Sequence, residues 1–339
     1  MIADITERMG KGMAEFLPKS AAEQTDRVQS RKEWDLYCHY VAGLVGIGLS
    51  QLFVAAGLED EASVGKQERL SNAMGLFLQK TNIIRDYHED ITELPAPRMF
   101  WPKEVWGKYA EDLGDFVRPG KAEEAVRCLN ELIVDALGHA TDSLEYLGRL
   151  RDPAVFRFCA IPQMMAIGTL AICYGNLRVF TGVVKLRRGL AARMVMNCRD
   201  RGMPAVLACF YHFAAEVRRR AARGPEGEPG RAAALEAARV LQAECVRRGH
   251  APPGQLLGAA AQALGWALAA GYATVAYSAE HVRARLGNLE RAGLGEGLGA
   301  AAVRALAPVA LPEYDSHHRT LAVLLLLLVF YFALIRPAN

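Results

Sequence analysis

Five side chains that could bind a metal ion or a phosphate lie at the end of the stretch MGLFLQKTNIIRDYHEDI. Asn82, Asp86 and Asp90 are four residues apart, so on an α-helix they share one face over about 12 Å. One oxygen ligand per turn suits Mg²⁺, which keeps several waters and takes few protein carboxylates. A magnesium ion held in this way can bridge to the phosphate oxygens of a substrate. Asn82, Asp86 and Asp90 together are called the ligand stripe below, and Arg85 and Glu89 lie beside it.

The same pattern is also typical of a solvated helix end, where aspartates and arginines pair on the surface. The residues that precede the carboxylates are strongly apolar, which favours carboxylates that project into a cavity rather than into bulk water. We therefore predict a metal site at this helix end, with a solvated helix face as the alternative.

The elements that must position these side chains are helices. Strand alternation and hairpin signals are missing from the sequence, and prolines separate the apolar helical runs, where they can end helices. Apolar residues recur at helical spacing in four long segments, residues 34–56, 71–90, 121–150 and 153–178. The sequence therefore predicts an all-α protein.

Composition narrows the class of protein. Charged residues make up 23% of the chain and the formal net charge is +3, so no broad nucleic-acid surface is indicated. The seven cysteines lie far apart without a CxxC pair, which argues against a zinc site and suits a reducing compartment. The N-terminal sequence MIADITERMGKGM lacks the apolar segment of a signal peptide.

The apolar run LAVLLLLLVFYFALI, Leu321–Ile335, is the clearest membrane signal. It is slightly shorter than the ~17–25 residues of a usual spanning helix, but Thr320 and a snorkelling Arg336 extend its reach. We expect a C-terminal membrane anchor at residues 320–336, with the preceding domain in the cytosol. A buried helix is the alternative.

Two further apolar runs resemble membrane spans. Pro162 and Gln163 interrupt residues 160–175, so a core helix or the wall of an apolar cavity is expected there. Residues 256–277 are rich in Ala and Gly, which have weak transfer energies. A membrane-associated helix and a packed helix remain equally open for this second run.

Three motifs closely resemble the squalene synthase family: YCHYVAGLVGIGLS at 37–50, MGLFLQKTNIIRDYHED at 74–90 and FCAIPQMMAIGTLA at 158–171. The resemblance covers roughly residues 1–220. It implies one all-helical domain of the trans-isoprenoid synthase type. Such an enzyme joins two farnesyl diphosphates head to head through presqualene diphosphate, and NADPH then reduces the rearranged cation to squalene.

The resemblance also implies roles for individual residues. NIIRDYHED matches the second aspartate-rich motif of the family, so Asp86 and Asp90 are expected to be Mg²⁺–diphosphate ligands, with Asn82 and Glu89 nearby. Tyr37 matches the catalytic tyrosine, a candidate for proton transfer or cation stabilisation. A core tyrosine with a satisfied hydroxyl is the alternative.

Two aromatic side chains, Phe156 and Phe158, match aromatics of the family's substrate pocket, where a ring face can stabilise a cation. Packing alone would explain both of them equally well.

The segment VVKLRRG, residues 183–189, resembles the family's basic NADPH segment. Lys185 and Arg187 are expected to meet nucleotide phosphates, as is Arg85, because these side chains suit phosphate in charge and donor geometry. The alternative for so short a basic patch is a solvated face. No GxGxxG follows a predicted strand, so any dinucleotide is expected to bind without a Rossmann unit.

The chain departs from the family pattern in one respect. The family carries two aspartate-rich motifs on facing helices, whereas DxxED occurs once here, at Asp86–Asp90. Met1 aligns past the first motif, so we expect an N-terminally incomplete synthase. Two alternatives stay open: a non-catalytic, membrane-anchored protein that binds isoprenoids or partners an intact synthase, and a phytoene-type prenyl-coupling enzyme.

Composition changes near residue 222 and divides the chain. GPEGEPGR at 224–231 predicts a flexible linker, and an Ala/Arg-rich helix is expected at 232–249. We therefore expect a partial squalene-synthase-like catalytic domain at 1–222, a linker and helical extension at 223–319, and the anchor at 320–336. The expected protein is a monomer on the endoplasmic reticulum membrane, facing the cytosol, which binds farnesyl diphosphate and no nucleic acid.

Overall fold

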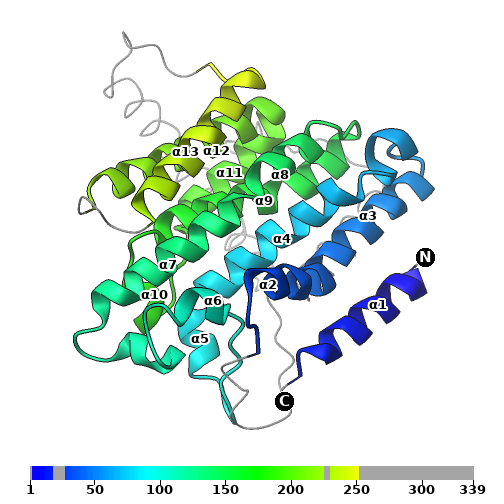
Figure 1. Ribbon diagram of the computed structural model, residues 1–339. Coiled ribbons are helices and arrows are strands. Elements are labelled where there is room, and N and C mark those ends of the chain that lie inside the picture. Colours follow the sequence, from blue (N-terminus) through cyan, green and yellow to red (C-terminus); the bar gives the residue numbers. More distant parts are fainter. Residues whose placement is uncertain (1, 18–26, 225–229, 252–339) are drawn as a thin grey trace, which may run out of the picture. The chain divides into compact units, whose positions relative to one another are not determined.

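Every regular element is a helix in the part of the chain that the computed structural model describes, residues 2–17, 27–224 and 230–251 (Figure 1). All of these residues belong to one compact unit, Met1–Ala270. The all-α prediction is therefore confirmed for them. The long helices are α1 (Ile2–Glu15), α2 (Arg31–Cys38), α3 (Leu44–Ala55), α4 (Glu68–Arg85), α7 (Ala122–Leu137), α8 (Ala140–Leu147), α9 (Pro153–Cys173), α11 (Arg188–Arg201), α12 (Met203–Ala222) and α13 (Arg231–Arg247).

Short helical elements complete the bundle. Three are single α-helical turns or little more, one is a 3₁₀ helix and two are π-helical turns. In chain order they are the π turns η2 (His39–Gly43) and η3 (Glu61–Gly65), the helices α5 (Tyr87–Ile91) and α6 (Lys103–Trp106), the 3₁₀ helix η4 (Leu113–Val117), and α10 (Arg178–Thr181).

Helix α4 is the centre of the bundle and packs against α3, α7, α8 and α9 (Figure 1). It is apolar around much of its circumference, and Leu70, Phe77 and Ile84 are almost fully buried along its length. A helix with neighbours on several sides needs such a pattern, because no wide face is left for water. The site residues at the end of α4 therefore project from a rigid, packed element.

Glycines allow α4 to approach the segment that carries the predicted catalytic tyrosine. A Cβ atom built on Gly75 would lie 2.4 Å from the carbonyl oxygen of Ala42, and one built on Gly46 would lie 2.3 Å from that of Ser71. These contacts are far closer than a methyl group tolerates. The chain between α2 and α3 forms the π turn η2 at this contact, which adjusts the register of two otherwise continuous helices.

The helix predicted at 71–90 is divided at Asp86. Backbone angles of φ −91° and ψ 13° at Asp86 end α4 and begin α5. The backbone amides of Asp86 and Asp90 still donate to the carbonyls of Asn82 and Asp86, each at 2.9 Å. The two helices are therefore successive, and the four-residue spacing of the predicted ligands is kept.

Helix α9 begins where local sequence predicts. The Asp152 side chain accepts hydrogen bonds from the amides of Ala154 and Val155, and Pro153 occupies the first turn. Pro162 lies inside the helix without ending it. Most of α9 is buried against α4 and α12, so the prediction of a core helix in residues 160–175 is confirmed.

Two helical stretches in the described part of the chain are long and apolar enough to cross a membrane, Arg31–Ala55 and Pro153–Cys173, with mean hydropathies of 1.5 and 1.6. Core helices pass the same test, and the second stretch is mostly buried in the bundle. The predicted anchor at 320–336 and the apolar run at 256–277 lie outside the described residues.

The Ala/Arg-rich helix predicted at 232–249 is α13, and it packs on α12 and also on α7 and α8. Ala234, Ala238, Leu241 and Cys245 form its buried face. The predicted domain boundary at residue 222 therefore separates two helices that pack together, since α13 belongs to the same compact unit as the preceding bundle.

Candidate functional site

The first predicted metal ligand, Asp86, is held by its neighbour in the chain. The Arg85 guanidinium donates from Nε and Nη2 to the two carboxylate oxygens of Asp86, at 2.7 and 2.8 Å. Both side chains are about one-fifth exposed. Burial alone would lower the pKa of Arg85, but its bonds to Asp86 raise it. The pair is a fork-to-fork contact in which both carboxylate oxygens of Asp86 are engaged.

Tyr37 lies near the other end of the predicted ligand stripe. Its ring stacks on Phe100 at 4.0 Å between centroids, with an interplanar angle of 11°, and Phe16 packs edge-on at 5.2 Å. Burial raises the pKa of the Tyr37 phenol above its ordinary value, and Asp90 raises it further. Tyr37 therefore stays neutral at physiological pH and lies within electrostatic reach of Asp90.

Two arginines, Arg27 and Arg98, lie near Tyr37. Arg27 lies over the Phe100 ring at 5.3 Å, and both Arg27 and Arg98 act electrostatically on the Tyr37 phenol, whose pKa they lower. The backbone amide of Arg98 donates to the carbonyl of Asp90 at 2.9 Å, which closes the loop after α5 beside the ligand stripe. Sequence reasoning did not select these two arginines, because no local pattern places residues 27 and 98 beside residue 37.

The remaining predicted ligands, Asn82 and Glu89, are half-buried on the same helical segment. Within the described residues, a group of three His, Cys, Asp or Glu ligands converges elsewhere, not on the stripe. The stripe instead offers two aspartates one turn apart, with an amide oxygen a further turn away. This donor set of hard oxygens fits Mg²⁺ with few protein ligands.

The two predicted pocket aromatics do not share one wall. Phe156 and Phe158 are two residues apart on α9, which places them about 200° apart around the helix. Phe156 belongs to the main core, whereas Phe158 meets Phe53 of α3 edge-on at 6.2 Å. The two rings therefore extend from different faces of α9.

The predicted NADPH segment follows α10 and enters the first turn of α11. Most of it is exposed, but Val184 is buried in the main core. Leu186 anchors it, because its methyl carbons reach within 3.3 Å of the position where a Cβ on Gly168 would lie. Lys185 and Arg187 flank this anchor and are exposed. Among the described residues, no carboxylate forms an ion pair with either of them, which leaves both cations available to an anion.

Helix α10 connects this basic segment to the metal stripe. Phe180 of α10 meets Tyr87 of α5 at 4.8 Å, and the Phe180 carbonyl lies 3.3 Å from Nδ1 of His88. Lys185 follows Phe180 by five residues. The fold therefore brings two sequence-predicted parts of the site, the stripe and the basic segment, to adjoining elements.

A buried ion-pair network behind Tyr37 was missed from the sequence. The Lys80 ammonium is 1% exposed, lies 4.6 Å from the centre of the Trp34 ring, and bonds to Asp35 and, at 2.5 Å, to Asp135. Arg31 donates to Asp135 at 2.7 Å. The network thus joins α2, α4 and α7.

The same network contains the three-ligand group Asp35, Asp135 and His139, whose ligand atoms lie within 4.8 Å of one another. Lys80 already contributes its positive charge to both carboxylates. Burial alone would raise the pKa of Asp135, but Lys80 and Arg31 lower it, whereas burial and Lys80 lower the pKa of His139. The Lys80 ammonium occupies the position between the two carboxylates and links the helices that carry them. A metal ion could bind there only by displacing Lys80.

Fold and site together define an all-helical protein with a candidate metal–diphosphate site beside a buried tyrosine. Residues 1–190 match the squalene/phytoene synthase family. This match covers more than half of the chain, and the chain belongs to that family.

Within that family, the chain is similar to individual squalene synthases. The chain is 50% identical over 248 residues to squalene synthase BSS of Botryococcus braunii and 55% identical over 229 residues to the squalene synthase of Rattus norvegicus. These matches cover 72% and 68% of this chain, but 52% and 51% of the relatives. The chain therefore spans about half the length of the curated relatives it matches.

A solved structure supports the same placement. The complex of TcSQS with the ligand BPH1237 matches with a TM-score of 0.66 and 41% sequence identity. The match covers 73% of this chain and 68% of that one. The fold of the bundle is thus shared with the solved TcSQS structure.

Proposed function

We propose that the chain carries out the chemistry of a squalene synthase, the head-to-head condensation of two farnesyl diphosphates and the NADPH-dependent reduction of the product. The observation that carries the proposal is the buried Tyr37 phenol stacked on Phe100, beside the loop in which the amide of Arg98 donates to the carbonyl of Asp90. Membership of the squalene/phytoene synthase family and identities of 50–55% to squalene synthases support it.

The stripe residues supply the site for a metal–diphosphate. Asp86 and Asp90 would hold Mg²⁺, with Asn82 and Glu89 beside them, and the ion would stabilise the negative charge of a diphosphate leaving group. The carboxylates are partly buried, which limits their contact with bulk water.

Tyr37 is suited to a reaction that passes through a carbocation. Its phenol is buried and neutral, so it can orient toward the cation or pass a proton without being alkylated as an anionic nucleophile would be. Arg27 and Arg98 add positive charge beside it, where a released diphosphate would be attracted. Phe156 and Phe158 remain candidates for lining the substrate cavity, from two different faces of α9.

The basic segment is the candidate reductant site. Lys185 and Arg187 would bind the phosphates of NADPH as exposed cations on a chain anchored by Leu186. Nε and Nη2 of Arg85 already bond to Asp86, so Arg85 could join them only through its remaining N–H donors while that pair stays closed. The exposed cations favour a reductase half-reaction, which a phytoene-type enzyme does not need.

The cellular setting is part of the same proposal. The apolar run at 320–336 would anchor the protein to the endoplasmic reticulum membrane with its helical domain in the cytosol. Its composition supports that placement, since it has no charge between Arg319 and Arg336. A monomer is the proposed state.

The proposal is tested first by ligand binding. In the full chain, Mg²⁺-dependent binding of farnesyl thiodiphosphate, measured by calorimetry, should weaken about tenfold or more in Asp86→Asn and in Asp90→Asn, because each removes a charge-assisted contact. Circular dichroism should show unchanged helicity. Near-normal binding in both variants would indicate that the stripe is a solvated helix face and not a metal site.

The proposal is tested secondly by product formation. The chain, extended at its N-terminus by a segment with a second DxxED motif, should convert farnesyl diphosphate to squalene with Mg²⁺ and NADPH. The same two variants should reduce turnover strongly. Intact Mg²⁺-dependent binding with no thirty-carbon product from the extended chain would support the non-catalytic, isoprenoid-binding alternative.

A further inference from the structure

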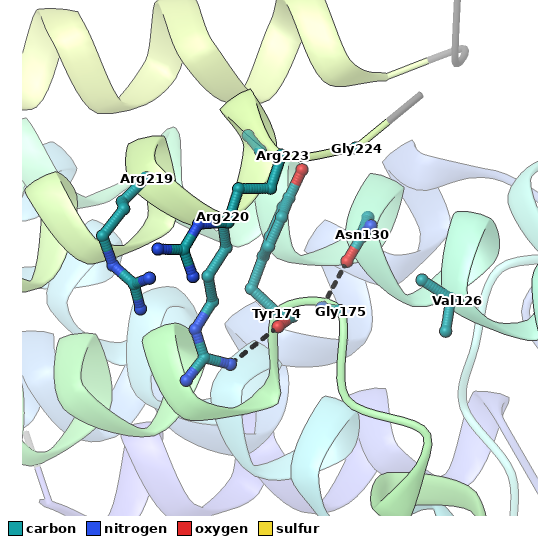
Figure 2. Close-up of a pocket in the computed structure, with 9 residues that line it drawn as sticks. Val126, Asn130, Tyr174, Gly175, Arg219, Arg220, Arg223 and Gly224 are labelled. Carbon is teal, nitrogen blue, oxygen red and sulfur yellow. Dashed lines mark hydrogen bonds between the residues drawn. The ribbon is translucent and has the colours of Figure 1, made fainter. Parts of the chain in front are cut away.

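A pocket of about 460 Å³ opens at the end of α12, where α7 and the turn after α9 come together (Figure 2). It is open to solvent rather than enclosed, so it can contact a charged group at the surface without burying a whole ligand. Three arginines and a buried tyrosine distinguish its wall from the surrounding surface. The residues that line it are Val126, Asn130, Tyr174, Gly175, Arg219, Arg220, Ala221, Arg223 and Gly224.

The turn at the base of the pocket is held in place. The Gly175 amide donates to Oδ1 of Asn130 at 2.8 Å, and Arg220 donates to the Tyr174 carbonyl at 3.0 Å, as Figure 2 shows. Gly175 has a φ of +66°, a left-handed conformation that favours glycine. The pocket is therefore built on a fixed turn rather than on loose side chains.

The charge of the pocket is unbalanced. Glu216 accepts hydrogen bonds from Arg219 and Arg220, which lower its pKa to about 2. Arg223 has no acidic partner among the described residues. Three guanidinium groups and one carboxylate leave two positive charges, of which the carbonyl end of α12 offsets only a fraction.

The arginines are also poised as donors. Glu216 is shared between two guanidinium groups, so each of these keeps N–H donors beyond that contact. Arg223 adds a third guanidinium group, and no carboxylate among the described residues pairs with it. Planar forks of this kind match the oxygens of a phosphate, and several around one concave wall can bind it from more than one direction.

The pocket is distinct from the aspartate stripe. None of the predicted metal ligands lines the pocket. None of the described residues that line the pocket is acidic, and the neighbouring Glu216 is engaged by Arg219 and Arg220, so the pocket differs in chemistry from the candidate active site.

We propose that this arginine pocket binds a phosphate or diphosphate group without a metal ion. The phosphate belongs either to a free small anion or to the headgroup of an anionic lipid. Arg219 and Arg223 supply the contacts that the ligand makes at the rim, and Arg220, fixed by the Tyr174 carbonyl, supplies the contact at the base.

The test uses the full chain in EDTA with inorganic pyrophosphate as the probe, followed by calorimetry. The double variant Arg219→Gln with Arg223→Gln should weaken binding about tenfold or more, because two charge-assisted contacts are lost. The matched control is Arg239→Gln with Arg247→Gln, since these exposed arginines of α13 pair with Glu236 and Glu244 in the same way. The control should bind as the unmodified chain does.

Two further variants separate this pocket from the other candidate sites. Asp86→Asn tests the ligand stripe, and Lys185→Gln with Arg187→Gln tests the basic segment. The second variant should keep the pyrophosphate binding that Arg219→Gln with Arg223→Gln weakens. If the Lys185/Arg187 variant abolished binding while the Arg219/Arg223 variant kept it, the anion site would be the basic segment and the pocket proposal would be wrong. Failure of the Mg²⁺-dependent test above would leave this result unaffected.

Vesicles distinguish the two sources of phosphate. Flotation with phosphatidylcholine vesicles is compared with flotation after phosphatidic acid is added, in the unmodified chain and in the Arg219/Arg223 variant. An increase with phosphatidic acid that the variant loses assigns the pocket to a lipid headgroup, whereas pyrophosphate binding without that increase assigns it to a free anion. No pyrophosphate binding and no phosphatidic acid effect would overturn the proposal.

Discussion

Several residues near the candidate site contact partners that are distant in sequence. The Tyr37 ring stacks on Phe100, and the charges of Asp90 and Arg98 shift the pKa of its phenol. Lys80 bonds to carboxylates 45 and 55 residues away in the sequence. The type and spacing of residues predicted Asp86 and Asp90 as candidate ligands. They could not predict that Arg85 would engage both oxygens of Asp86, because a helix neighbour can point into solvent equally well.

Lys80 provides the clearest test at this scale. Replacing it with methionine leaves Asp135 partly buried beside Arg31 alone, and Asp35 loses its cation. Removing one partner of a buried ion pair costs about 3 kcal/mol, so Lys80→Met should lower the urea midpoint markedly without a change in the slope of the transition.

Adding Asp135→Asn to Lys80→Met should recover part of the lost stability, because the second change removes an uncompensated charge. Arg69→Met is the matched control, since Arg69 pairs with Asp142 on the surface and is mostly exposed. Equal losses in Lys80→Met and Arg69→Met would show that the buried network contributes no more than a surface pair.

At the scale of elements, helical periodicity predicted several long helices but not where they break, and α1, α11 and α12 lie outside the four periodic runs. The run at 34–56 contains α2, η2 and α3, and the run at 121–150 contains α7 and α8. The π turn η2 lies where Gly75 and Gly46 bring two backbones together, which is a tertiary contact and has no local signal. The second break lies at Gly138 and His139, between two amphipathic helices.

The close approach at Gly75 can be tested directly. In Gly75→Ala the new methyl group would lie 2.4 Å from the Ala42 carbonyl oxygen, which is backbone and cannot rotate away. Overpacking of this kind costs about 1–3 kcal/mol, more than the gain of about 1 kcal/mol in helix propensity. Thermal unfolding should therefore occur at a lower temperature.

Gly10→Ala on α1 is the matched control for Gly75→Ala. A Cβ atom at Gly10 meets nothing within 4 Å, so only the propensity gain remains and stability should rise slightly. A rise in both variants would mean that α4 and η2 are not packed as closely as described.

The segment between α10 and α11 is predicted to act as a unit in the second half-reaction. In the N-terminally extended chain, Lys185→Ala with Arg187→Ala should reduce NADPH affinity about tenfold or more per lost phosphate contact. Farnesyl diphosphate should still be consumed, and presqualene diphosphate should accumulate, because the reductant acts after the carbon skeleton is joined. Liquid chromatography with mass spectrometry measures both species.

Two controls define the outcome of that experiment. Arg201→Gln, at the opposite end of α11, changes an exposed cation away from the segment and should leave both half-reactions unchanged. Tyr37→Phe should stall before any thirty-carbon product appears. Parallel loss of both steps in the Lys185/Arg187 variant, with unchanged NADPH affinity, would make the basic segment structural.

For the whole molecule, one helical bundle carries the stripe, Tyr37 and the basic segment, and the membrane anchor is a separate prediction from composition. The family resemblance found in the sequence is confirmed by the match over residues 1–190 and by the solved structure at 41% identity. The pocket at the end of α12 was not predicted, because its arginines look like a solvated helix face until α7 and the turn after α9 are placed beside them.

The anchor is tested by removing residues 320–339 and by Leu326→Arg in the intact chain. Both changes should move the protein from the membrane pellet to the supernatant after a high-salt wash. The first removes the whole apolar run, and the second places a charge near its centre, at a cost of about 2.5–3.5 kcal/mol. Removal of residues 337–339 alone is the control and should leave the protein in the pellet, because the apolar run and Arg336 stay in place. If the chain without residues 320–339 remained in the salt-washed pellet, the anchor would lie elsewhere, and residues 256–277 would be the next segment to remove.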